Sequence, residues 1–339
     1  MKRIIWASML LGLAVVLMPL LFNNSGSAVE VMSDYEPTIP SPLQSTAPSA
    51  PSPVVQSYKE VADTEKTLVV LSDGVLTETT MAEYLPLAVA AEMPASFHSE
   101  ALKAQAVAAR TYVSYCTKHE NPKHPSAEIC TESGCCLACM SMDELRAAWG
   151  ADFEENLSVV REAVEATQGQ VLIYGGEPIL ASFHSSSAGY TESGSELWGE
   201  VPYLVSVASP ETERDVPDFV TTVEVSTGEM METVKLLKPE AVFCEDAQWW
   251  LGEIERDESG RVRNMNIALV KLTGQEVRTL FGLRSTAFTV EYTGSSFLFT
   301  VKGYGHGLGM SQYGANVMAK SGFSYAEILY HYYPETKLV

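Results

Sequence analysis

The stretch YLPLAVAAEMPASFHSEALKAQAVAARTYVSY, residues 84–115, decides the fold, because it predicts two helices in succession. Just before it, Thr80 and Glu83 have the Thr-x-x-Glu spacing of a capping box, so the first helix should begin near Met81. Pro86 either interrupts this helix or restarts it as a first-turn residue.

The first helix should end soon after Glu92, because Pro94 disfavours helical geometry in the residue that precedes it. Ser99 then opens a longer, alanine-rich helix, EALKAQAVAARTYVSYC. Its apolar residues recur at helical spacing and fall on one face: Leu102, Ala106, Ala109 and Val113.

Strand patterns surround this helical pair. LVVLSDGVLTE, from Leu68, predicts two strands joined at an Asp-Gly turn, and VLIYGGEPILASF, from Val171, predicts a hairpin with a Gly-Gly turn. Helices are expected over residues 142–150 and 155–167, and further strands and hairpins follow Phe219. Because the helices come first and the strands later, the sequence predicts an α+β fold and not a βαβ sheet.

The composition argues against one broad class of partner. The 339 residues include 43 acidic and 22 basic side chains, which gives a net charge of −21. Such a field repels phosphate groups, so nucleic acid is not expected as a partner. Acidic runs such as residues 211–215 are interpreted as solvated faces, and the length allows one or two domains.

The N-terminus indicates that the body of the chain lies outside the cytoplasm. Residues 4–22 form an uncharged apolar run of 19 residues, close to the ~20 that span a bilayer, and two basic residues precede it. We interpret residues 1–28 as a single-pass membrane anchor, with a cleaved signal peptide as the alternative. Residues 29–65, rich in Pro and Ser, predict an extended linker, and residues 66–339 predict the extracytoplasmic catalytic domain.

Five of the six cysteines fall in one short region, which indicates either disulfides or a metal site. Cys135 and Cys136 are neighbours, and neighbouring cysteines rarely bridge each other without strain. The spacing His124-x5-Cys130-x4-Cys135-Cys136 offers one imidazole and three thiols, a set that suits tetrahedral zinc, and Cys139 competes for one position. Because four protein ligands leave no position for water, such a zinc ion would be structural.

Glu92 is the candidate catalytic carboxyl group. It lies in LAVAAEMPASF, among apolar residues, where burial disfavours the charged form and raises the pKa. A raised pKa is what a general acid needs at neutral pH, and the amides that open the next helix should stabilise the anion once it forms. The alternative is an exposed glutamate at a helix end, or one paired with Lys103 or Arg110.

Two polar segments are candidates for binding the substrate. FHSSSAGYTES contributes His184, Ser186 and Tyr190, whose polar groups suit the hydroxyl and N-acetyl groups of sugars. GYGHGLGMSQYGA contributes His306 and Gln312 on a backbone that can approach a ligand closely. No Lys-Ser or Lys-Thr directly follows one of its glycines, so it does not match a phosphate-binding loop. For both segments the alternative is a structural loop or turn.

Three motifs in this order resemble the stage II sporulation protein D family and the related amidase enhancers: residues 84–115, FHSSSAGYTES and GYGHGLGMSQYGA. The resemblance covers residues 68–333. It implies a peptidoglycan lytic transglycosylase, which cuts between N-acetylmuramic acid and N-acetylglucosamine without water and leaves a 1,6-anhydro end. The family's catalytic glutamate lies in an A-x-E-M-P motif, which falls on Glu92. The three motifs are therefore expected to meet around a glycan groove.

The resemblance also implies a setting and a metal. Such proteins act in engulfment during sporulation, from the mother-cell membrane facing the septum, on glycan strands whose stem peptides an amidase has removed. They act with that amidase and a multispanning membrane partner. The sporulation branch resembles this chain in its zinc cluster, although Cys135 stands where a second histidine is expected. The alternative functions are a non-catalytic amidase enhancer that binds peptidoglycan and a zinc peptidase, and the latter lacks its His-Glu-x-x-His helix.

Overall fold

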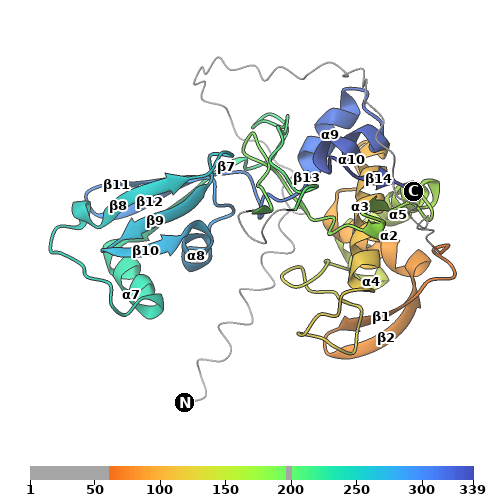
Figure 1. The fold of residues 1–339 in the computed structure, drawn as a ribbon, viewed down its shortest axis with the longest axis horizontal. Helices are drawn as coiled ribbons and strands as arrows, with labels where there is room; N and C mark the ends of the chain where they lie inside the picture. The colour runs from red at the N-terminus through yellow and green to blue at the C-terminus, as the bar shows by residue number, and fades with distance from the viewer. Residues whose placement is uncertain (1–60, 196–200) are drawn as a thin grey trace.

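The computed structural model describes residues 61–195 and 201–339, which form an α+β fold as the sequence predicts (Figure 1). This part of the chain contains two separate hydrophobic cores. We call the first the helical lobe (residues 61–195, 201–211 and 303–339) and the second the inserted lobe (residues 220–302). In Figure 1 the inserted lobe projects away from the helices of the helical lobe. The inserted lobe can do so because its own strands and helices enclose its core.

The two helices of the opening stretch form where the sequence predicts. α2 (Met81–Glu92) begins with a complete capping box, in which Thr80 and Glu83 bond reciprocally. Pro86 lies inside α2 without interrupting it. α3 (Ser99–Cys116) begins after His98, whose side chain accepts a hydrogen bond from the backbone N–H of Glu100.

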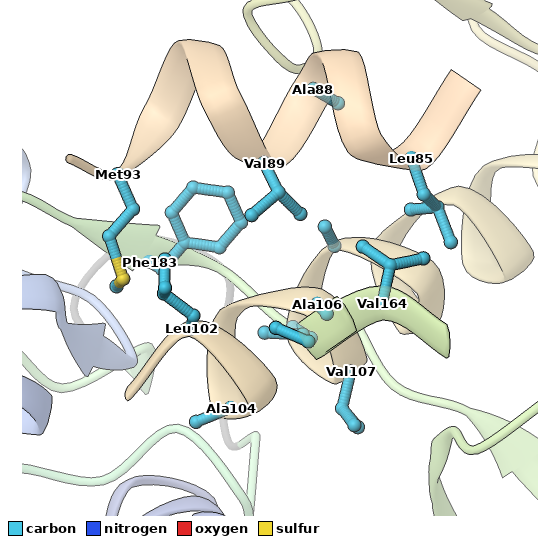
Figure 2. Close-up of a cluster of buried hydrophobic side chains, with 14 of the residues drawn as sticks. Leu85, Ala88, Val89, Met93, Leu102, Ala104, Ala106, Val107, Val164 and Phe183 are labelled. Atoms are coloured by element: carbon cyan, nitrogen blue, oxygen red, sulfur yellow. The ribbon is translucent and has the colours of Figure 1, made fainter. Parts of the chain in front are cut away.

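The helical lobe is built around α3. Three further helices pack on it in addition to α2: α5 (Phe153–Ala166), α9 (Gln312–Lys320) and α10 (Tyr325–Tyr332). The four predicted core residues of α3 are fully buried, and so are the alanines on its other sides, because small side chains let neighbouring helices approach closely. Figure 2 shows the side chains that fill the space between α2 and α3, among them Leu85, Val89, Met93, Leu102 and Ala106.

Small sheets cover this helical core. β1 (Thr67–Ser72) and β2 (Val75–Thr80) form the predicted hairpin, and β3 (Ile129–Cys130) pairs with β1 in parallel. The pairing places Cys130 beside Leu71 of β1. The hairpin turns through an Asp-Gly pair with positive φ, as its sequence predicts.

The chain then adds two helices and a second sheet. α4 (Met142–Trp149) leads through the 3-10 turn η2 (Gly150–Asp152) into α5. The predicted Gly-Gly hairpin is β4 (Leu172–Tyr174) with β5 (Glu177–Pro178), and β14 (Lys337–Leu338) completes the sheet from the C-terminus.

The inserted lobe holds two three-stranded antiparallel sheets, β11-β12-β7 and β10-β9-β8. Buried aromatic rings pack between its elements, for example Trp250 on Phe297 and Phe281 on Phe299. In chain order the elements are β7 (Val220–Ser226), α7 (Thr227–Leu237), η3 (Ala247–Trp249), β8 (Leu251–Arg256), β9 (Val262–Ile267), β10 (Val270–Thr273), α8 (Gly274–Leu280), β11 (Phe288–Tyr292) and β12 (Ser296–Lys302).

The expected order of helices first and strands later is wrong in this lobe. α7 and α8 interrupt the strands, and each begins at a capping residue followed three positions later by glutamate. These are Ser226 with Glu229 and Thr273 with Glu276. The same spacing marks the start of α2, which the sequence predicts correctly.

Within the described residues, no helix has the length and apolarity needed to cross a membrane. The predicted anchor, residues 1–28, and most of the predicted linker lie outside the described residues. Asp63, at the end of the range assigned to the linker, is buried in the helical lobe and forms an ion pair with Arg110 (Oδ2–Nη2, 2.8 Å).

Candidate active site and metal cluster

Glu92 is the last residue of α2, and its carboxyl group is only partly exposed. Its Oε1 accepts a hydrogen bond from the backbone N–H of Ala138 at 2.9 Å. Burial raises the pKa of Glu92 to about 7, although the Ala138 N–H and the side-chain amide of Gln312 both favour the charged form. At neutral pH this carboxyl group is therefore populated both with and without its proton, which suits an acid that later acts as a base.

The surroundings of Glu92 differ from the sequence-based expectation in one respect. The amide that binds its carboxyl comes from Ala138, on the loop before α4, and not from the start of α3. Neither basic residue considered as a partner pairs with it, because Lys103 binds Glu100 (2.7 Å) and Arg110 binds Asp63. No cation therefore neutralises Glu92 from either position, which leaves burial as the dominant influence on its pKa.

Gln312 is the first residue of α9, near the C-terminus, and its side chain lies near Glu92. Its side chain is 6% exposed, and its Nε2 has no hydrogen-bond partner among the described residues. A buried amide without a partner is costly, so such a group commonly marks a place where a ligand or water completes the hydrogen bonding. The amide lies close enough to the Glu92 carboxyl to lower its pKa, although the two groups are not placed with the geometry of a hydrogen bond.

The two polar segments predicted to bind substrate lie side by side. β6 (Phe183–His184) pairs in parallel with β13 (Met310–Ser311). A bridge between Ser186 and Tyr304 extends this contact, with backbone hydrogen bonds of 3.0 and 2.9 Å. Since β13 runs directly into Gln312, the pairing brings both segments to the neighbourhood of Glu92.

The predicted binding residues divide into supporting and exposed groups. His184 is buried, and its ring nitrogens lie 3.1 Å from the carbonyl oxygen of Leu308 and 2.7 Å from Ser187 Oγ. Burial holds the pKa of His184 well below its ordinary value, so the ring is neutral and braces the two segments. His184 therefore does not offer the direct substrate contact that the sequence suggested.

The remaining predicted residues are open to a ligand or lack a partner. Tyr190 is 47% exposed, and His306 is exposed while its Nδ1 accepts a hydrogen bond from the Leu308 N–H at 3.0 Å. Ser186 is buried, and its hydroxyl has no hydrogen-bond partner among the described residues.

Glu211 organises these segments and was missed by the sequence analysis. Its buried carboxylate accepts hydrogen bonds from the Ser187 N–H (2.6 Å), Ser209 Oγ (2.6 Å) and Ser311 Oγ (2.5 Å). The prediction that residues 211–215 form a solvated face is therefore wrong for Glu211. Burial raises its pKa and the three donors oppose that rise. No local pattern identifies this role, because Ser311 is 100 residues away in the sequence.

The glycine spacing of GYGHGLGMSQYGA is explained by packing. A Cβ at Gly305 would lie 2.8 Å from the Cβ of His184, and one at Gly309 would lie 1.9 Å from the carbonyl oxygen of Ser182. Both glycines also have positive φ, which side chains disfavour. The glycines thus allow two backbone segments to pack closely.

The inserted lobe touches the same loop through Arg261. A Cβ at Gly307 would lie 2.6 Å from Arg261 Cζ, so the glycine makes room for the guanidinium group. Arg261 is fully buried, and its Nε lies 3.9 Å from a carboxylate oxygen of Glu192. Burial and contact with Asp257 raise the pKa of Glu192 to about 8, against the opposing charge of Arg261.

The cysteine-rich loop gathers the four predicted metal ligands. The ligand atoms of His124, Cys130, Cys135 and Cys136 all lie within 4.8 Å of one another. In a tetrahedral site with zinc–sulfur bonds of ~2.3 Å, ligand atoms are roughly 3.8 Å apart, so the arrangement fits zinc. None of the six cysteines forms a disulfide, and Cys139 does not belong to the cluster.

Hydrogen bonds orient the side chains of this cluster. His124 Nδ1 lies 3.0 Å from the carbonyl oxygen of Ala127, which makes Nδ1 the protonated nitrogen and turns Nε2 toward Cys136 Sγ at 3.2 Å. Asn121 Nδ2 donates toward Cys135 Sγ at 3.5 Å. The residue that binds Glu92, Ala138, follows this cluster by two positions, so the loop that holds the ligands also holds the carboxyl group.

A family model described as "Stage II sporulation protein" matches residues 73–174. The chain is 38% identical over 256 residues to the stage II sporulation protein D of Bacillus amyloliquefaciens, covering 74% of this chain and 72% of that protein. This chain belongs to the stage II sporulation protein D family.

Two further relatives of this family member extend the comparison. The stage II sporulation protein D of Bacillus subtilis (strain 168) is 37% identical over 261 residues, covering 76% of this chain and 73% of that protein. The amidase enhancer of the same organism is 29% identical over 306 residues, covering 73% of this chain and 39% of that protein. The family model covers Glu92 and the four metal-ligand candidates, and it ends before His184.

Proposed function

We propose that this sporulation protein D family member is a peptidoglycan lytic transglycosylase, with Glu92 as the single group that donates and then accepts a proton. The observation that carries the proposal is the environment of Glu92. Its pKa is raised to about 7, one backbone N–H binds it, and an amide without a partner faces it. The names of the two sporulation relatives support a role in sporulation.

The reaction needs one carboxyl group in two protonation states. Protonated Glu92 gives its proton to the glycosidic oxygen as the bond from the muramic C1 breaks. The muramic C6 hydroxyl then bonds to C1, and the Glu92 carboxylate takes the hydroxyl proton, which restores the acid and yields a 1,6-anhydro end. Between these steps the Ala138 N–H and the Gln312 amide stabilise the carboxylate.

Hydrolytic glycosidases generally use a second carboxylate. Glu211 cannot serve as one here, because three donors in the core occupy its oxygens. Glu92, a partly exposed carboxyl group with a raised pKa, suits intramolecular attack by the substrate's own hydroxyl. Exposed Tyr190 and His306, together with the free donor of Gln312, would bind the sugars around the bond.

Zinc is proposed as a structural ion held by His124 and the three cysteines. When bound, it would cross-link the loop that carries Ala138 and so fix the N–H that binds Glu92. Four protein ligands complete a tetrahedral site, so the metal has no place for substrate.

The setting is also a proposal. Residues 1–28 would anchor the protein in the mother-cell membrane facing the engulfment septum, with the catalytic lobe outside the cytoplasm. An amidase that strips stem peptides would supply the substrate, and a multispanning membrane protein would accompany both. The similarity to an amidase enhancer supports the link to an amidase.

The test is to incubate the full-length protein with peptide-free glycan strands and to weigh the products by mass spectrometry. Anhydro-muramic ends, one water lighter than hydrolysed ends, are expected with the wild type and not with Glu92→Gln. Glu258→Gln, at an exposed glutamate of the inserted lobe, is the matched control and should cleave normally. Products with hydrolysed ends, or full cleavage by Glu92→Gln, would contradict the proposal.

The second candidate is a non-catalytic enhancer that binds glycan and stimulates an amidase, and the amidase-enhancer relative is the observation that favours it. In the same assay this function gives no cleavage alone, but a faster release of stem peptides when a purified sporulation amidase is added. Glu92→Gln would then stimulate the amidase as well as the wild type does.

A further inference from the structure

A pocket of about 450 Å³ lies away from Glu92, at the far end of α3. Three tyrosines from different parts of the chain line it: Tyr115 at the end of α3, Tyr174 of β4 and Tyr203. The rings of Tyr174 and Tyr203 lie 5.6 Å apart with a tilt of 53°, and Tyr174 is 38% exposed. The pocket therefore presents aromatic surface to solvent.

The tyrosines are held in place by neighbouring groups. Tyr115 stacks on His119, with ring centroids 3.9 Å apart and an angle of 11° between the planes. Tyr203 Oη accepts a hydrogen bond from the Leu180 N–H at 3.3 Å, and burial raises the pKa of Tyr203, so its hydroxyl keeps its proton. Rigid aromatic rings with polar edges offer flat apolar faces and hydrogen bonds together, which is the combination a sugar ring matches.

The charge at the rim favours a neutral ligand. Lys118 and Glu177, both lining the pocket, form an ion pair with each other, so their charges cancel. The chain as a whole carries a net charge of −21, which disfavours anionic ligands. The N-acetylglucosamine units of a peptide-free strand are neutral sugars of this kind, whereas each muramic unit carries a lactyl carboxylate.

Two chain segments tie the pocket to the candidate active site. Ile179 lines the pocket, and His184 lies only five residues further on, so the two are at most about 18 Å apart. The second segment runs from Tyr203 to Ser209, which binds Glu211. The pocket is therefore joined by a short stretch of chain to the paired segments of the candidate active site.

We propose that this pocket is a remote glycan-binding site, which holds a distant part of the same strand that Glu92 cleaves. The proposal rests on the proposed function for the choice of ligand. The pocket would make binding depend on strand length, because only a strand longer than the active site can fill both places, and linking two sites on one ligand strengthens binding.

The experiment measures binding and not cleavage, so that it does not depend on catalysis. Full-length protein with Glu92→Gln is titrated into fluorescently labelled, peptide-free glycan, either long strands or a tetrasaccharide, and anisotropy is recorded. Adding Tyr174→Ala should weaken binding of long strands about tenfold, the loss expected for one stacking ring, and leave tetrasaccharide binding unchanged. Tyr174→Phe, which keeps the ring, should bind like the parent.

Trp249→Ala is the matched control, because Trp249 is an aromatic residue 72% exposed on the inserted lobe, outside the pocket. Equal binding of long strands by the parent and Tyr174→Ala, with unchanged melting temperature, would overturn the proposal. So would displacement by free stem peptides, which would make the pocket a peptide site. If the wild type does not cleave glycan but the dependence on Tyr174 persists, the pocket assignment stands and the catalytic one fails.

Discussion

Two carboxylates of the helical lobe, Glu92 and Glu211, are satisfied to very different degrees. Glu211 lies in the core and accepts three hydrogen bonds, from one backbone N–H and two hydroxyl groups. Glu92 accepts one from Ala138 and faces an amide nitrogen of Gln312 that has no partner among the described residues. Burial raises the pKa of both groups. The number of donors thus distinguishes a carboxylate that holds structure from one that can exchange protons.

The largest effect is expected from Glu92→Gln. Glutamine keeps the shape and the contact with Ala138 but cannot transfer the proton, so glycan cleavage should fall by roughly a thousandfold or more. The rate of release of anhydro ends measures this. A loss below about tenfold would show that another group supplies the proton.

The free energy of unfolding of Glu92→Gln should also depend on pH differently from that of the wild type. The pKa of Glu92 rises on folding from 4.5 to about 7, so the charged form is disfavoured in the fold. The wild type therefore loses stability as the pH rises between these values, and Glu92→Gln does not. Urea unfolding should show that the free energy of unfolding of the variant, relative to that of the wild type, is higher at pH 8 than at pH 5.

Glu211→Ala should act on folding first. It leaves one buried N–H and two buried hydroxyl groups without their acceptor, which costs roughly 3 kcal/mol of the free energy of unfolding. Urea denaturation measures the loss, and Glu213→Ala, at an exposed glutamate two positions later, is the control. A variant as stable as the wild type would show that Glu211 does not fasten these segments.

Breaking the metal cluster should have an intermediate effect. Cys136→Ser should abolish stoichiometric zinc in the purified protein and reduce cleavage roughly ten- to a hundredfold, because the loop that carries Ala138 loosens. Elemental analysis and the cleavage assay measure the two consequences. Cys244→Ser, at an exposed cysteine of the inserted lobe, should change neither. Full zinc content in Cys136→Ser would point to another ligand set.

Gln312→Ala should give the smallest change, visible mainly as a function of pH. The acid form of Glu92 starts the reaction, so kcat/KM should decline as the pH rises above about 7. The Gln312 amide lowers the pKa of Glu92, so its removal should raise that pKa and move the decline to higher pH. An unchanged pH profile would mean that Gln312 does not act on the carboxyl group.

Local signals predicted much of the helical lobe, the raised pKa of Glu92 and the grouping of the four metal-ligand candidates. The capping box and the prolines located α2 and α3, since such signals act within a few residues. The close spacing of His124 and the cysteines brought the cluster together in one loop. The apolar neighbours of Glu92 already indicated a raised pKa.

What the sequence did not reveal depends on contacts between distant residues. Ala138 contributes a backbone N–H, which any residue type could supply, so nothing marks it. Glu211 looked like part of an acidic surface because its partners, Ser187 and Ser311, lie far away in the chain. His184 looked accessible in a polar loop, but pairing of β6 with β13 buries it.

The inserted lobe leaves and rejoins the rest of the molecule at nearly the same point. Gly303 N–H donates to the carbonyl oxygen of Phe219 at 2.9 Å, and Val220 pairs with Lys302 in the first and last strands of the lobe. A lobe whose ends are neighbours can be exchanged or removed by joining the two ends, without lengthening the chain of the helical lobe. Its attachment passes directly into the glycine segment at Gly303, so an exchanged lobe would keep its first and last strands next to that segment.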